Sequence, residues 1–153
     1  LRMQISGESG SVFDATQQSL DMSLEIEGEK PDWEALGNAI QSVGVVNYEI
    51  ERDSVFQGAF AKSDGYFWLS KRSDGQRKTV IAEGNHGCEF SVWNTIVFRI
   101  NNSFYDEFVE DIHIFLKRLA ELSSMQFVLS FQYEGVYAIR NEKEFQFFWD
   151  QPR

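Results

Sequence analysis

Cysteine is nearly absent from this sequence of 153 residues, in which Cys88 is the only example. A lone cysteine excludes an intrachain disulfide and is typical of a protein that works in a reducing compartment. Long apolar runs are absent too, since the longest, such as Thr95 to Phe98, stop at four or five residues, and a bilayer-spanning helix needs about 20. The first ten residues lack the basic start and apolar stretch of a secretory signal. We therefore expect a cytoplasmic protein with no membrane segment.

Basic residues are in the minority. The chain has 14 Lys and Arg against 24 Asp and Glu, which gives a formal net charge of -10. A surface of this sign repels phosphate backbones and anionic lipid headgroups. We therefore expect neither nucleic acid nor a membrane surface as a partner, whereas a basic protein partner is electrostatically allowed.

Several motifs for catalysis and cofactor binding are missing. The sequence contains no glycine-rich phosphate loop, no Gly-x-Ser-x-Gly elbow and no cluster of Cys and His with zinc-binding spacing. Two histidines are enough for a Ser-His-Asp arrangement, but no spacing points to one. We therefore expect no cofactor and no metal, and a function without catalysis is favoured.

Aromatic residues, in contrast, are abundant, with 14 Phe, 5 Tyr and 4 Trp. Such rings bury large areas, and a chain of this length can bury roughly 70% of its unfolded surface in one core. We expect a single α+β domain over residues 19 to 153, preceded by a flexible arm or an edge strand at residues 1 to 18. Its central element is a helix over about residues 103 to 122, where apolar side chains recur at steps of three and four residues. These side chains are Phe104, Phe108, Ile112, Phe115, Leu119 and Leu122.

The rest of the pattern predicts a mainly antiparallel sheet, with both helices packed on one of its faces. Between residues 19 and 27 apolar and polar residues alternate strictly, as in a strand with one buried side. Short strands separated by turn signals leave no room for helical crossovers, which indicates antiparallel pairing. The expected strands cover residues 19–27, 45–52, 55–62, 66–71, 77–83, 89–100 with a bulge near 93–94, 127–133 and 136–140.

A second helix is expected from Pro31 to about Ser42, ended by Gly44. Asn141, followed three residues later by Glu144, has the spacing of a capping box and predicts a short C-terminal helix. The order strand, helix, strand, strand occurs at about residues 19 to 62 and again at about 94 to 140. Two such units could together form a split β-α-β arrangement with both helices on one face of a sheet. Element order alone is weak evidence for a duplication, because matching positions carry different side chains.

Four carboxylates gather at the start of the central helix: Asp106, Glu107, Glu110 and Asp111. Negative charge is favourable at a helix N-terminus, and an exposed helix face is often charged simply because it is solvated. The same residue types can also hold a hard cation, act as an acid/base pair or bind basic residues of a partner. Like charges four residues apart slightly destabilise a helix. This favours a binding role, and we take the four residues as candidate partner-binding residues.

A second group of candidates is aromatic or near Cys88. Trp68, Trp93 and His86 are candidates for lining a small-molecule pocket. Cys88 could act as a nucleophile if His86 served as its base, or as a metal ligand if carboxylates or His113 completed the set. The simpler alternative is a small buried thiol beside a turn.

Three functional hypotheses follow. The leading one is a small, acidic, non-catalytic protein-binding module, such as a bacterial inhibitor or immunity-type factor whose acidic face covers a basic site. The first alternative is a small-molecule-binding or enzymatic domain with a pocket between sheet and helices. The second alternative is a secretion chaperone or assembly subunit, which predicts a homodimer.

Overall fold

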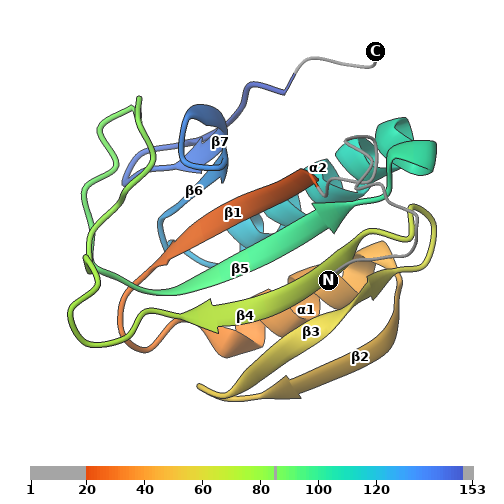
Figure 1. Ribbon diagram of the computed structural model, residues 1–153, viewed down its shortest axis with the longest axis horizontal. Coiled ribbons are helices and arrows are strands. Elements are labelled where there is room, and N and C mark those ends of the chain that lie inside the picture. The colour runs from red at the N-terminus through yellow and green to blue at the C-terminus, as the bar shows by residue number, and fades with distance from the viewer. Residues whose placement is uncertain (1–19, 85, 150–153) are drawn as a thin grey trace, which may run out of the picture.

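The computed structural model describes residues 20–84 and 86–149, so the arm or edge strand expected at residues 1–18 lies outside the described residues. The chain forms an eight-stranded antiparallel sheet in the order β2-β3-β4-β5-β1-β6-β7-β8. Both helices lie on one face of this sheet and pack against each other (Figure 1). The expected α+β fold is therefore confirmed. The elements are β1 (Leu20–Glu27), α1 (Trp33–Val43), β2 (Val45–Glu51), β3 (Val55–Phe60), β4 (Tyr66–Lys71), β5 (Val92–Ile100), the 3-10 turn η2 (Asn102–Phe104), α2 (Tyr105–Leu122), β6 (Phe127–Phe131), β7 (Gly135–Arg140) and β8 (Phe145–Phe147).

Strand β1 is the middle of the sheet, because it pairs with β5 on one side and with β6 on the other. β5 and β6 are therefore parallel to each other, and α2 makes the crossover of a split β-α-β unit around β1. The expected echo holds for the order of elements but not for their places in the sheet. β2, which follows α1, is an edge strand, whereas β6, which follows α2, pairs with β1 at the centre.

One side of β1 supplies the floor of the main core. Met22, Leu24 and Ile26 are each at most 1% exposed, and burying an apolar side chain of this size contributes about 1.5–3 kcal/mol. Aromatic and aliphatic side chains from both helices and from β3 to β5 pack in the same cluster. They include Leu36, Ile40, Phe56, Phe60, Phe67, Phe98, Phe108, Ile112, Phe115 and Leu119.

Side-chain caps set where the helical segments begin. The Asp32 carboxylate accepts a hydrogen bond from the backbone N–H of Ala35 at 3.1 Å, so α1 starts slightly later than predicted. The side chain of Asn101 caps η2, and α2 follows directly. Phe104 and Leu122, which the sequence places in the buried stripe of α2, are 41% and 37% exposed because they lie at its two ends.

The turn between β3 and β4 packs directly against α2. A Cβ atom on Gly65 would lie 2.5 Å from a ring carbon of Phe108, so a side chain at this position would push the turn and the helix apart. Ser63, in the same turn, is fully buried and donates hydrogen bonds from its hydroxyl and its backbone N–H to Asp111 of α2. A polar contact and a glycine thus hold this end of the sheet against the helix.

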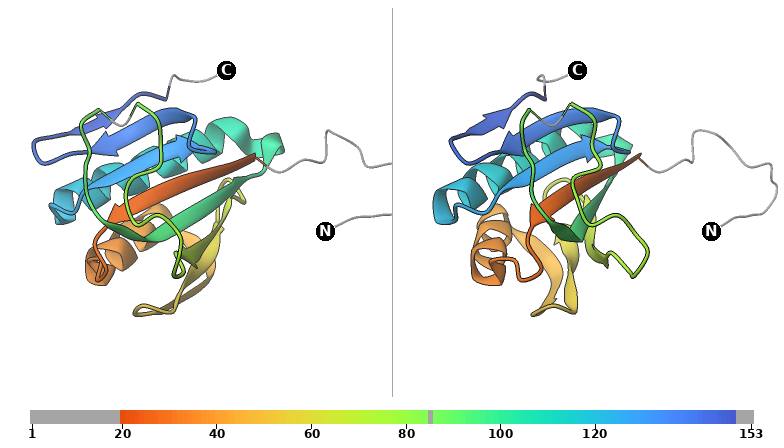
Figure 2. Two further views of the ribbon diagram at one scale, coloured as in Figure 1. Left: turned by 60° about the vertical axis from the view of Figure 1, so that its left-hand side comes forward. Right: turned by 90° about the vertical axis from the view of Figure 1, so that its left-hand side faces the viewer.

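Residues 72–91, here called the covering segment, connect β4 to β5 across the outer face, which is the sheet face away from the helices (Figure 2). The sequence predicts a strand at residues 77–83, and this prediction is wrong. One isolated bridge, from Thr79 to Ser91, is the only pairing in that stretch of the described chain. The cause is Glu25 of β1, whose carboxylate accepts from the backbone N–H groups of Ile81 at 2.6 Å and Ala82 at 3.2 Å. These two amides therefore bind a side chain instead of a neighbouring strand.

The covering segment buries a second apolar cluster on the outer face. Val80, Ala82 and Cys88 from the segment pack with Val128 of β6 and Ile139 of β7. In the register of the sheet Val128 lies opposite both Glu25 and Ile139, and directly paired residues share a face. The segment therefore covers the outer face over β1, β6 and β7.

The predicted short C-terminal helix is also wrong, because residues 145–147 form strand β8 paired with β7. Asn141 does bind the backbone three residues ahead, since its side-chain oxygen accepts from the N–H groups of Lys143 and Glu144 at 2.8 and 2.9 Å. The N–H of Asn141 also donates to the carbonyl of Glu144 at 3.0 Å, which closes a hairpin turn. After it, Phe145 and Phe147 alternate with a glutamine, and this period of two suits a strand.

Among the polar side chains, the carboxylate of Glu25 should be the one whose removal lowers stability most. Its partner Arg72 lies 2.7 Å away, and the two side chains are 0% and 6% exposed. We expect Glu25→Gln to lower the free energy of unfolding by about 3–5 kcal/mol, because Arg72 would stay buried without a counter-charge.

Asp21→Asn is the matched control. Asp21 lies on β1 like Glu25, but its ion pair with Arg99 of β5 is solvent-accessible, with side chains 33% and 47% exposed respectively. This substitution should cost about 1 kcal/mol or less. Urea unfolding of both variants measures the difference, and similar losses would show that the buried pair does not hold the covering segment.

Candidate functional site

The part of the outer face over β2 to β5 presents two cross-strand rows of side chains, here called the open rows. Directly paired residues of an antiparallel sheet share a face, so the register of the strands defines each row. No described segment crosses β3 and β4 on this face (Figure 1). The first row contains Val46, Ala59, Tyr66, Arg99 and Asp21, and the second contains Glu49, Gln57, Trp68, Val97 and Ser23.

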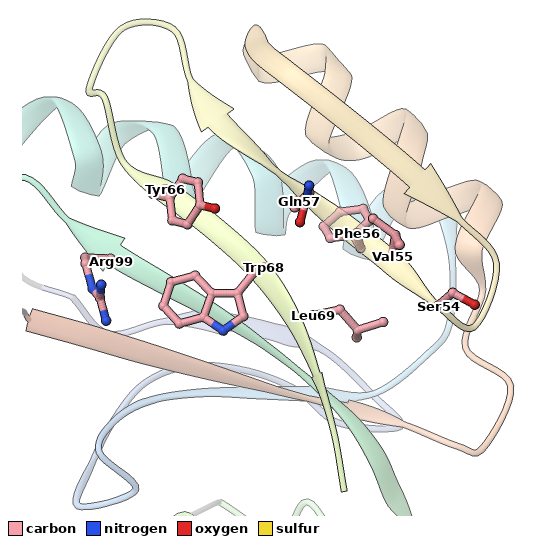
Figure 3. Close-up of a pocket in the computed structure, with 8 residues that line it drawn as sticks. All are labelled: Ser54, Val55, Phe56, Gln57, Tyr66, Trp68, Leu69 and Arg99. Atoms are coloured by element: carbon pink, nitrogen blue, oxygen red, sulfur yellow. The ribbon is translucent and has the colours of Figure 1, made fainter. Parts of the chain in front are cut away.

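Trp68 is the centre of the open rows. The Tyr66 ring centroid lies 5.6 Å from that of Trp68, and the Arg99 guanidinium lies 5.0 Å from the Trp68 ring (Figure 3). Arg99 is itself fixed by Asp21, to which it donates two hydrogen bonds of 2.9 and 3.1 Å. A cation over an indole face is attractive, so this cluster presents its rings in one fixed arrangement.

A shallow hollow of about 420 Å³ lies beside these rings and is lined by residues of β3, β4 and β5, among them Val55, Gln57, Tyr66, Trp68 and Arg99. Tyr66 is 48% exposed. Trp68 beside it is half-buried. Trp, Tyr and Arg are the residue types most enriched among the hot spots of protein interfaces. The sequence pattern marks Trp68 as a candidate, but the contribution of Arg99 depends on strand register and is not visible in the sequence.

The other two pocket candidates lie elsewhere. Trp93 is covered by the ammonium group of Lys78, 5.0 Å from its ring, and His86 stacks on Phe148 with centroids 4.5 Å apart. Trp68, Trp93 and His86 therefore do not share one environment. A groove of about 300 Å³ does lie between a helix and the sheet, between α1 and β2. It is lined by other residues, among them Trp33, Gly37, Gln41, Tyr48 and Arg52.

The four carboxylates at the start of α2 do not form one exposed patch. Asp111 is 2% exposed, and Glu110 forms an ion pair with Lys62. Asp106 and Glu107 border an open hollow of about 580 Å³ at the beginning of the helix. A partner-binding role thus stays a prediction, and Asp111 lies where a partner cannot reach it without rearrangement.

Asp111 is instead a buried acid. Burial raises the pKa of Asp111 above its ordinary value, while hydrogen bonds from Ser63 and the charge of Lys62 partly oppose this shift. One of its carboxylate oxygens, Oδ2, has no hydrogen-bond partner among the described residues. A buried carboxylate that is incompletely paired destabilises the folded state when it is ionised.

Asp111→Asn should therefore change how stability depends on pH. An acid whose pKa is raised by folding stabilises the folded state below its unfolded pKa of about 3.9, and this contribution is lost as the pH rises through the folded pKa. We expect the wild-type free energy of unfolding to lose more than that of Asp111→Asn as the pH rises above about 4. Urea unfolding at several pH values tests this, with exposed Asp106→Asn as control, and parallel curves for wild type and Asp111→Asn would contradict it.

Cys88 is placed as a core residue and not as a nucleophile. It is 0% exposed, and its thiol points to the carbonyl oxygen of Arg140 at 3.8 Å. Burial raises the pKa of the Cys88 thiol to about 11, so the reactive thiolate is scarce at neutral pH. His113, the other residue considered for a metal site, stacks on Phe147 with ring centroids 4.0 Å apart. Burial and the charge of Lys117 lower the pKa of His113.

The Cys88 thiol should accordingly be protected in the folded protein. We expect a thiol-specific reagent near neutral pH to label it slowly in buffer and rapidly in urea, because an unfolded cysteine has a pKa of about 8.5 and is accessible. Absorbance of the released chromophore follows the reaction. Rapid labelling in buffer at a rate independent of urea would show that Cys88 is an accessible, activated thiol.

A basic group was not among the candidates, although the sequence carries a signal for it. Four of the 14 basic residues fall within residues 71–78: Lys71, Arg72, Arg77 and Lys78. The net charge of the whole chain conceals this local run. Lys71 ends β4, and the other three lie at the start of the covering segment, next to the open rows.

Comparison with family models, with curated proteins and with solved structures found no match to this chain. Function is therefore inferred from its own residues. In the described ranges no three His, Cys, Asp or Glu side chains are grouped so as to hold a metal ion. Neither helix in that part of the chain has the length and apolarity needed to cross a bilayer.

Proposed function

We propose that this chain is a non-catalytic protein-binding domain and that it holds a polypeptide partner against the open rows. The observation that carries the proposal is the ring pair of exposed Tyr66 and half-buried Trp68, on a sheet face that no described segment covers there. Large rings left on a sheet surface lose the stabilisation that burial would give them. A partner that covered the two rings would restore this stabilisation on binding.

The shape of the surface favours a polypeptide over a small molecule. The hollow beside Trp68 is shallow, whereas small-molecule sites are concave and bury most of the ligand. The rings are held on paired strands, with Arg99 fixed by Asp21, so binding would immobilise few additional side chains. A preorganised surface of this kind lowers the entropic cost of association.

A narrower version of the proposal concerns the partner's charge. A basic partner, as for an inhibitor or immunity-type factor, fits the start of α2, where Asp106 and Glu107 border a hollow. The open rows, by contrast, adjoin the basic run at residues 71–78. We place the main contact on the open rows because fully buried apolar anchors, not rim charges, carry most interface energy. The single free thiol supports a cytoplasmic location for the protein.

Selection of binding peptides from a random displayed library tests the proposal. Wild-type protein serves as bait, and the affinities of enriched peptides are measured for two variants. We expect Trp68→Ser to weaken binding at least tenfold, about 1.4 kcal/mol, as for removal of an aromatic anchor. Ile114→Ser is the matched control, because Ile114 is 46% exposed on α2, away from the open rows. The affinity of this variant for the peptides should equal that of wild type.

Circular dichroism and thermal unfolding of both variants confirm that the bait is folded. Peptides that bind wild type and Trp68→Ser equally well would refute the assignment to the open rows. Enriched peptides that are rich in Lys and Arg, and whose binding is lost in Glu107→Lys but not in Trp68→Ser, would move the site to the start of α2.

A further inference from the structure

We propose that a cleft under the covering segment binds a small phosphate monoester. The cleft is a cavity of about 270 Å³ between the segment and the outer face of β4 and β5. Thr95 and Val97 lie on its floor, and Arg72, Arg77 and Tyr133 are among its walls. The site uses neither Tyr66 nor Trp68, so it goes beyond the proposed function.

Two cations at the cleft have no counter-charge. Among the described residues neither Lys71 nor Arg77 forms an ion pair. The Lys71 ammonium donates to the backbone carbonyl of Asp53 at 2.6 Å, and Nε of Arg77 donates to the hydroxyl of Thr79 at 2.7 Å. Both contacts leave the positive charge uncompensated. In a chain with net charge -10, two such neighbours make a local anion-attracting site.

The carboxylate of Glu25, on the strand beside the cleft floor, does not cancel this attraction. Glu25 lies next to Thr95 in the register, but its two oxygens accept hydrogen bonds from Arg72 and from the backbone N–H groups of Ile81 and Ala82. The Glu25–Arg72 pair is therefore neutral as a unit. The charges of Lys71 and Arg77 remain as the net charge of the lining.

One residue that lines the cleft carries a buried hydroxyl without a partner. Thr95 is 4% exposed, and its Oγ1 has no hydrogen-bond partner in the described part of the chain. Buried polar groups are almost always paired, so we expect this hydroxyl to bind a ligand or a water. Ser70 lies directly opposite Thr95 on β4 and also lines the cleft. Two hydroxyls and two cations in the lining are donors of the kind that bind phosphate oxygens.

The remaining lining limits the ligand's size and kind. Two uncompensated positive charges match a phosphate dianion better than a single carboxylate. Val97 on the floor and Ile81 beside it supply an apolar surface for a short organic group. A volume of 270 Å³ lies just below the ~300–1,000 Å³ of drug-sized ligand pockets, which suits a phosphate ester of a few carbon atoms.

Titration of the backbone amide NMR spectrum tests the site, with glycerol phosphate as the probe. Inorganic phosphate, succinate and uncharged glycerol are the comparison ligands, all at constant ionic strength because surface charge effects are screened by salt. We expect saturable shifts at residues 70–77 and 95–97 with glycerol phosphate. The double variant Lys71→Gln with Arg77→Gln should bind at least about tenfold more weakly, and Thr95→Val about threefold more weakly.

The control is Lys117→Gln with Arg118→Gln, which makes the same change of net charge at exposed positions of α2 and should leave binding unchanged. Thermal unfolding confirms that each variant is folded. Equal affinity for inorganic phosphate would support the anion site and show that the apolar surface of Val97 and Ile81 adds nothing to the affinity. The proposal is overturned if glycerol phosphate binds wild type and the Lys71/Arg77 variant equally, causes no saturable shift, or binds no better than glycerol or succinate.

Discussion

The buried carboxylate of Glu25 is the constraint on which the outer half of the structure depends. It lies on the middle strand of the sheet with no exposed surface, and an unpaired charge in such a place costs several kcal/mol. The chain satisfies it with Arg72, at the start of the covering segment, and with two backbone amides further along. The segment is thereby held to the sheet at two points. This explains how a stretch with almost no strand pairing can bury Val80, Ala82 and Cys88 against β6 and β7.

Covering one side of the outer face leaves the other side open. The helices bury the opposite face of the sheet along its length, but the covering segment reaches over β1, β6 and β7. The open rows over β2 to β5 keep their rings at the surface, and the boundary between covered and open parts contains the cationic cleft. Both proposed sites therefore result from where one connection crosses the sheet.

Local periodicity predicts most of the fold, and long-range pairing explains the rest. The alternation around Leu24 and the helical stripe around Ile112 depend on residues close in sequence, so β1 and α2 are predictable. The 77–83 stretch does not pair as a strand because a side chain 56 positions away, Glu25, binds the Ile81 amide. The burial of Asp111 depends on Ser63, in a turn far away in the sequence. Strand order, and with it the meeting of Trp68 and Arg99, is equally invisible to local patterns, so the sequence identifies Trp68 as a candidate without its neighbours.

The two proposed sites are adjacent, and this has a thermodynamic consequence. Trp68 and Ser70 are two positions apart on β4, as are Val97 and Thr95 on β5, which corresponds to about 7 Å along a strand. Val97 lies in an open row and also lines the cleft. A polypeptide over Trp68 and an anion above Thr95 would therefore contact the same side chain or each other. Any change that one ligand makes in the affinity of the other must then be reciprocal. An acidic side chain of the partner would compete for Lys71 and Arg77, whereas an apolar one would close the cleft over its ligand, so the sign of this coupling reports which residues of the partner lie at the boundary.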